Sequence, residues 1–151
     1  MSFDPAPVAS DPRIEQSLER ALERLTADSG TVHVKEPGRA VLVLAAARGV
    51  PAPVLDIVRV VPWGKGMAGL AAERAAPVDA CNIQTDATGN VRPGARATGV
   101  QGAIVVPMLR EGRVVGTFGV GCRVERAFTP EETAWLQAEA NALAEAIGAG
   151  L

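Results

Sequence analysis

The stretch that decides the fold runs from Gly102 to Arg123 and reads GAIVVPMLREGRVVGTFGVGCR. It contains two apolar runs, Gly102–Leu109 and Arg113–Arg123, on either side of Glu111-Gly112. Two such runs separated by a short turn with glycine predict antiparallel strands joined as a β-hairpin. Helices from elsewhere in the chain must then cover the apolar faces of these strands.

A second predicted hairpin lies upstream of the first. The runs Thr31–Lys35 and Val41–Ala47 flank Glu36-Pro37-Gly38, and a Pro-Gly pair favours a tight turn. Neither Val41–Ala47 nor Ile104–Val106 alternates cleanly between apolar and polar residues, which indicates strands that are buried on both sides. We therefore expect one antiparallel sheet with both faces covered.

Two amphipathic helices are predicted, one near each end of the chain. The first has Asp11 as its cap and runs to Leu25 with apolar residues at helical spacing. The second begins after Thr129, with Glu132 placed to bond back to the cap, and runs to Ile147. Hairpins combined with helices in this order define an α+β fold.

The middle of the chain is expected to hold shorter elements. They are a helical turn at Val54–Val58, an extended segment at Arg59–Pro62, a helix at Met67–Ala75 and a brief strand at Pro77–Asp79. We expect residues 11–151 to form one domain. Residues 1–10, which contain two prolines and little apolar content, are expected to be disordered.

Composition excludes several classes of function. The 151 residues carry a net charge of −2, and aromatic residues make up 3% with no Tyr, so neither a basic face nor stacking platforms for nucleic acid are expected. One His and two Cys argue against a metal cluster and an unaided hydrolase triad, so no catalytic or metal-binding residue is assigned. The longest apolar run, Ala40–Ala47, is too short to cross a membrane, and the N-terminus does not look like a signal peptide. We expect a cytoplasmic protein.

Four segments, in this order along the chain, resemble the GAF domain family of sensor modules. They are Pro62–Glu73 (PWGKGMAGLAAE), Ala103–Leu109 (AIVVPML), Arg113–Val120 (RVVGTFGV) and Phe128–Glu132 (FTPEE). The resemblance implies a GAF/PAS-like, six-stranded antiparallel sheet with both terminal helices on one face. It also implies a small-molecule site on the other face, under the short helices and the 81–99 loop. The identity of the ligand or of any cofactor does not follow from the fold and stays unknown.

The resemblance also offers an enzymatic alternative, the free methionine-R-sulfoxide reductases. Those family members carry a cysteine where this chain has Ala68, and another in the segment that corresponds to Gly99–Gly102. A thiol mechanism needs a thiolate nucleophile, which alanine lacks, so we favour a sensor over an enzyme. Cys122, on a predicted strand, is interpreted as a small buried apolar residue.

The segment Gly64-Lys-Gly-Met-Ala-Gly69 fits the letters of a dinucleotide-binding fingerprint. That function needs a parallel strand before the glycines, whereas the surrounding pattern is antiparallel. We interpret the segment as a tight turn with close helix packing.

Candidate ligand-binding residues come mainly from the loop at 81–99. Arg92 and Arg96 bracket a Pro-Gly turn, and paired guanidinium groups suit a carboxylate or phosphate. We therefore expect a small polar or anionic metabolite. The other candidate contacts are Trp63, Met67, Cys81, Asn82, Thr85 and His33. For His33 we favour a partly exposed position on the hairpin over a contact with a ligand.

The partners expected from the sequence are a small molecule, a second copy of the chain and a signalling protein. The terminal helices both carry apolar stripes, and a homodimer would bury whatever part of them the sheet leaves uncovered. The alternative is that the stripes only cover the sheet. Neither nucleic acid nor a membrane is an expected partner.

Overall fold

A computed structural model describes residues 11–85 and 99–148 of the chain. Its strands form one six-stranded antiparallel sheet in the order β3-β2-β1-β6-β5-β4. The elements are α1 (Pro12–Leu25), β1 (Ser29–Lys35), β2 (Val41–Arg48), α2 (Ala52–Val58), β3 (Val60–Pro62), α3 (Gly66–Arg74), β4 (Val78–Ala80), β5 (Gly102–Arg110), β6 (Arg113–Cys122) and α4 (Pro130–Gly148). The expected α+β fold is confirmed. Residues 1–10, predicted to be disordered, lie outside the described residues.

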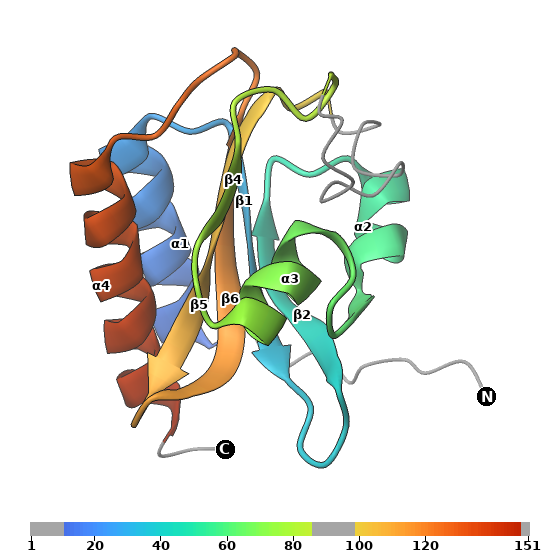
Figure 1. Cartoon of the computed structure of the whole chain (residues 1–151), viewed down its shortest axis with the longest axis vertical. Coiled ribbons are helices and arrows are strands. Elements are labelled where there is room, and N and C mark those ends of the chain that lie inside the picture. Colours follow the sequence, from blue (N-terminus) through green and yellow to red (C-terminus); the bar gives the residue numbers. More distant parts are fainter. Residues whose placement is uncertain (1–10, 86–98, 149–151) are drawn as a thin grey trace.

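The helices cover the sheet from both sides. Figure 1 shows α1 and α4 packed together on one face and α2 and α3 on the other. Both predicted hairpins are present: β1 pairs with β2, and β5 pairs with β6. β1 also pairs with β6, which brings the two hairpins together at the centre of the sheet.

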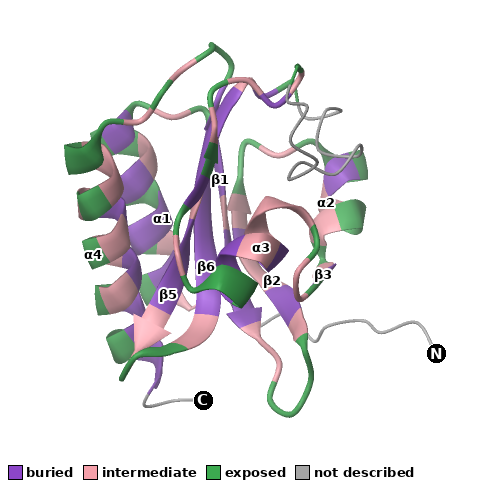
Figure 2. Cartoon of the chain, in the orientation of Figure 1, coloured by how far each residue is buried: buried purple, intermediate pink, exposed green. Residues whose placement is uncertain are grey.

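The main core lies between the sheet and the terminal helices, where the buried residues gather in Figure 2. Leu18 of α1 and Leu136 of α4 are fully buried there against Val106 and Phe118 of the central strands. The apolar stripes of α1 and α4 therefore cover the sheet. Among the described residues, the large hydrophobic side chains left exposed are Ile57 and Val124, and neither belongs to these two helices.

Local signals explain where the helices begin and end. The side chain of Asp11 accepts a hydrogen bond of 2.9 Å from the backbone N–H of Arg13, as expected of a cap. Thr129 and Glu132 form the predicted reciprocal pair: the Thr129 hydroxyl accepts from the Glu132 N–H, and Glu132 accepts from the Thr129 N–H. α1 ends at Leu25 because Thr26 adopts the left-handed conformation at φ 50°.

The glycine segment before α3 is a close-packed turn, as predicted. Gly64 has φ +81°, and its N–H donates to the carbonyl of Gly69 at 2.9 Å. A Cβ at Gly69 would lie 2.4 Å from the carbonyl oxygen of Pro62, so only glycine lets the helix approach the strand this closely. β3, which precedes the turn, is antiparallel to β2. The parallel unit that a dinucleotide fingerprint requires is therefore absent at this segment.

The described residues include no helix that is long and apolar enough to cross a membrane.

Candidate functional site

A cavity of about 190 Å³ lies between the sheet and the two short helices α2 and α3. Its floor is formed by β1, β5 and β6, and its roof by residues of α2 and by the start of α3. The side chains and backbone that line it are Ser29, Gly30, Thr31, His33, Val50, Val54, Ile57, Val58, Val61, Lys65, Gly66, Met67, Ala68, Ile83, Val100, Ala103, Val105, Gly119, Val120 and Gly121.

The space exists because this face of the central strands carries small residues. Successive side chains of a strand point to opposite faces. In β6, Phe118 packs into the core under α1 and α4, while Gly119 and Gly121 face the cavity. In β5, Ile104 faces that core and Ala103 faces the cavity. The same hairpin thus fills one side of the sheet and leaves room on the other.

The cavity lining is mainly apolar. Among the described residues, polar side chains come from Ser29, Thr31, His33 and Lys65, and the other lining residues are apolar or glycine. Ile57 of α2 lines the cavity while 45% of it is exposed, which places it at the edge of the opening. Such a lining suits a ligand with an apolar body and few polar groups.

His33 is the most buried of these polar residues, with 2% of its surface exposed. Its Nε2 atom lies 2.8 Å from the carbonyl oxygen of Val58. A carbonyl oxygen only accepts, so Nε2 carries the proton. Burial lowers the pKa of His33 to about 4, although the hydrogen bond to Val58 acts in the opposite direction. The ring is therefore neutral at pH 7, and the expectation of a partly exposed hairpin residue is wrong because α2 covers it.

The structure brings only some of the predicted contact residues together. Met67 and His33 line the cavity. Trp63 does not, because its indole packs against Leu42, Val61 and Ala72 near the edge strand. Arg92 and Arg96 lie outside the described residues.

The remaining predicted residues lie just after β4 and do not line the cavity, although Ile83, which is between them in the sequence, does. Cys81 is exposed. Asn82 accepts a hydrogen bond of 3.0 Å from the backbone N–H of Gln84, and its carbonyl accepts from the N–H of Thr85. Asn82 and Thr85 thus form a local turn, which explains why asparagine suits this position.

Sequence reasoning missed Ser29, Thr31 and Ala103 as cavity residues. The available signal was the spacing of small residues on the central hairpin, with Gly119 and Gly121 two apart on one face of β6. The described residues contain no group of three or more His, Cys, Asp or Glu side chains that could hold a metal ion.

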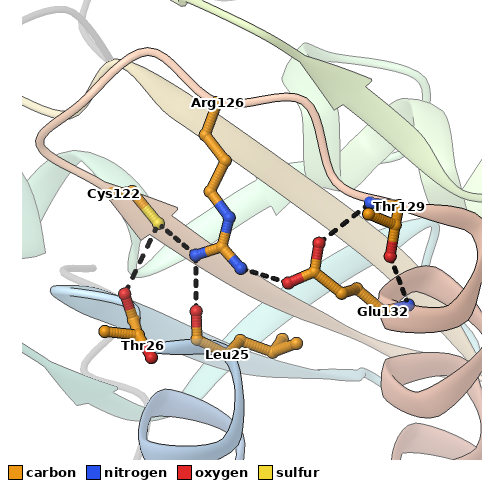
Figure 3. A network of polar contacts seen from close by, with 6 residues as sticks. All are labelled: Leu25, Thr26, Cys122, Arg126, Thr129 and Glu132. Carbon is orange, nitrogen blue, oxygen red and sulfur yellow. Dashed lines mark hydrogen bonds and ion pairs between the residues drawn. The ribbon is translucent and has the colours of Figure 1, made fainter.

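Neither cysteine is among the residues that line the cavity. Cys122 is 1% exposed at the end of β6, which confirms its interpretation as a buried residue. A guanidinium nitrogen of Arg126 lies 3.2 Å from its Sγ atom (Figure 3). The same guanidinium donates to the carbonyl of Leu25 and pairs with Glu132.

This Arg126 network joins three parts of the fold. It connects the end of β6, the last turn of α1 and the first turn of α4, as Figure 3 shows. Arg126 also lies over the ring of Phe128, 4.5 Å from its centroid. The hydrogen bond from the Thr129 N–H, together with the nearby Arg126, lowers the pKa of Glu132. The arrangement links the terminal helices, and none of its side chains lines the cavity.

The chain belongs to the GAF domain family, whose sequence model matches residues 14–148. This agrees with the antiparallel sheet, the placement of the terminal helices and the cavity on the opposite face. None of the curated proteins matches the sequence.

Solved structures share the fold at low sequence identity. The GAF domain of a phosphoenolpyruvate-protein phosphotransferase from Coxiella burnetii is 24% identical, with a TM-score of 0.72 and coverage of 93% of this chain and 89% of that one. A GAF domain/HD domain protein from Geobacter sulfurreducens is 15% identical, with a TM-score of 0.76 and 93% of each chain covered. A type II free methionine-R-sulfoxide reductase from Thermoplasma acidophilum is 19% identical, with a TM-score of 0.73 and 93% of each chain covered. At these identities the likeness shows the fold alone.

Proposed function

We propose that the chain is a small-molecule-binding regulatory domain whose ligand occupies the cavity between the sheet and helices α2 and α3. The observation that carries this proposal is the cavity itself, which lies where small floor residues meet a helical roof. The space has a volume of about 190 Å³ and a mainly apolar described lining, and concave apolar pockets of this kind are where small molecules usually bind. GAF domains occur in sensor-type proteins, which agrees with this function.

The residues that line the cavity favour a different ligand from the one predicted from the sequence. The prediction of a polar or anionic metabolite was based on Arg92 and Arg96, which lie outside the described residues. The described wall is mainly apolar, and its most buried polar group, His33, is neutral. Lys65 also lines the cavity, but it is exposed, so water screens its charge. A ligand that is largely apolar therefore fits the buried part of the described wall better than an anion.

A thiol-dependent sulfoxide reductase is the alternative function, and the placement of the cysteines weighs against it. Ala68 lines the cavity, whereas the chain's two cysteines do not. A nucleophile must reach its substrate within about 3–3.5 Å. Cys122 is further enclosed by the Arg126 network. We therefore propose binding without thiol chemistry.

Signalling through a homodimer or through a partner protein is a prediction from the sequence. The apolar stripes of α1 and α4 are buried within the chain, so a homodimer through these helices would have to use their polar faces. A signalling partner protein is the other predicted route. Light scattering at micromolar concentration distinguishes a dimer from a monomer.

Native mass spectrometry of freshly purified protein tests the proposal directly. We expect a retained small molecule, or one found by screening, whose binding is reduced by Ala103→Leu. Ala103 lies on the cavity floor, so a larger side chain there occupies the space. Ala134→Leu makes the same chemical change at an exposed position on α4 and should leave binding unchanged. Equal binding by both variants and the parent chain would show that the cavity is not the site.

A further inference from the structure

His33 has a ring nitrogen, Nδ1, that no described residue uses as a hydrogen-bond partner. The residue is 2% exposed and forms part of the cavity wall. Its Nε2 atom is occupied by the carbonyl of Val58. Within the described ranges 11–85 and 99–148, no residue bonds to its Nδ1 atom. This nitrogen also keeps some accessible surface. Nδ1 is therefore open to a hydrogen bond from a ligand, and the space beside His33 is the cavity.

The state of the ring determines what Nδ1 can bind. Because Nε2 carries the proton and the ring is neutral, Nδ1 has a free lone pair and acts as an acceptor. It matches a ligand hydroxyl or N–H group. A neutral imidazole has no charge with which to neutralise a carboxylate or a phosphate. The oxygens of these anions are acceptors, as Nδ1 is, so no hydrogen bond forms between them.

The rest of the wall limits the size and polarity of the ligand. Apolar side chains of the wall come from the α2 roof, Val54 and Val58, and from Ala103 and Val105 on the floor. An engineered apolar cavity of roughly 150 Å³ binds benzene. A cavity of about 190 Å³ therefore accommodates one six-membered ring with a small substituent.

We propose that the cavity binds a compact, neutral, largely apolar molecule with one hydrogen-bond donor, and that Nδ1 of His33 accepts this bond and determines specificity. This inference rests on the proposed function, because it names the class of ligand for the same cavity. It differs from the sequence-based expectation of an anion.

Three probes of similar size test the inference on the full chain by NMR titration. Phenol has the ring and the donor, toluene has a methyl group in place of the hydroxyl, and benzoate carries a negative charge. We expect phenol to bind more tightly than toluene, although toluene is the more apolar molecule, and benzoate to bind most weakly. Toluene binding more tightly than phenol, or benzoate binding best, would overturn the inference and leave the cavity as a ligand site. If none of the three binds, the inference is wrong, and the retained-ligand experiment decides separately on the proposed function.

The variant His33→Gln examines the role of the residue. Glutamine offers an N–H that can donate to Val58, but no acceptor at the position of Nδ1. We expect its affinity for phenol to fall by about 3- to 10-fold, as for the loss of one hydrogen bond, with toluene affinity unchanged. An equal loss for both probes would indicate a purely structural role and contradict the assignment. If the variant does not fold, the relative affinities of the parent chain for phenol and toluene still test the inference.

Discussion

His33 on β1 and Val58 at the end of α2 are joined by a hydrogen bond of 2.8 Å from Nε2 to the carbonyl oxygen. Both residues line the cavity. The bond therefore fastens the roof helix to the central sheet through a side chain that also forms the cavity wall. A ligand that bonds to the other nitrogen of the same ring would contact the group that holds the roof in place.

Acid should destabilise the protein through His33. Burial lowers the folded-state pKa to about 4, below the ordinary value of 6.5, so the unfolded chain binds the proton more readily. The contribution of His33 to the free energy of unfolding is therefore fully present above pH 6.5. It is lost as the pH falls toward 4, and the total loss is about 3 kcal/mol. Urea unfolding at pH 7.0, 5.5 and 4.5 measures this change. His33→Gln should show a shallower slope between pH 6.5 and 4.5, and an unchanged slope would contradict the assignment to His33.

Removing the hydroxyl of Thr117 should not destabilise the fold. Thr117 is 1% exposed, and its Oγ1 atom has no hydrogen-bond partner among the described residues. Valine has the same shape without the polar atom, so Thr117→Val is expected to be neutral or to stabilise by up to about 1 kcal/mol. Thr117→Ser is the matched control, because it keeps the hydroxyl and removes the methyl group, and should cost about 1 kcal/mol. Thermal unfolding measures both, and a large loss for the valine variant would show that the hydroxyl is used.

Truncating Arg126 should weaken the attachment between the terminal helices. Arg126→Ala leaves the Leu25 carbonyl, Cys122 and Glu132 without their shared donor. Since the guanidinium is partly buried, we expect a loss of about 2 kcal/mol in the free energy of unfolding. The exposed neighbour Arg123 provides the control, and Arg123→Ala should change stability by less than about 0.5 kcal/mol. Similar effects for both variants would mean that the network contributes little.

A methyl group at Gly69 should displace α3. The added Cβ would lie 2.4 Å from the carbonyl oxygen of Pro62 and 3.1 Å from the backbone nitrogen of Gly64, which are backbone atoms that cannot rotate away. We expect Gly69→Ala to cost about 2 kcal/mol even though alanine favours a helix. Gly38→Ala is a useful comparison, because that turn has no atom within 4 Å of the added Cβ and only its φ of +74° opposes the change. Gly69→Ala should also impair ligand binding, since α3 forms part of the cavity roof.

Local patterns predicted the parts of the fold that depend on neighbours in the sequence. The turns at Gly38 and Gly112, the Asp11 cap and the Thr129–Glu132 pair all involve residues that are close along the chain. The boundaries were less accurate. α2 begins at Ala52, before the predicted Val54, and β1 begins at Ser29, before the predicted Thr31.

The candidate site was only partly predictable. Met67 and His33 do line the cavity, but Trp63 packs elsewhere and Cys81 is exposed. These predictions were based on residue type. Residue type does not reveal which face of a covered sheet is packed with core side chains and which face leaves a cavity. Ser29 and Ala103 were missed because small residues carry no chemical signal of their own.

By itself the sequence determined the two hairpins and the caps of the terminal helices, because alternation, turn residues and caps act over a few positions. The family followed from the resemblance of four ordered segments to GAF domains. Only the tertiary structure decided where the cavity lies and what lines it. The space arises where Gly119 and Gly121 of β6 come next to Thr31 of β1 under helices from a different part of the chain. His33 shows the difference most clearly: its neutral state depends on its burial beneath α2, some 25 residues further along the chain at Val58.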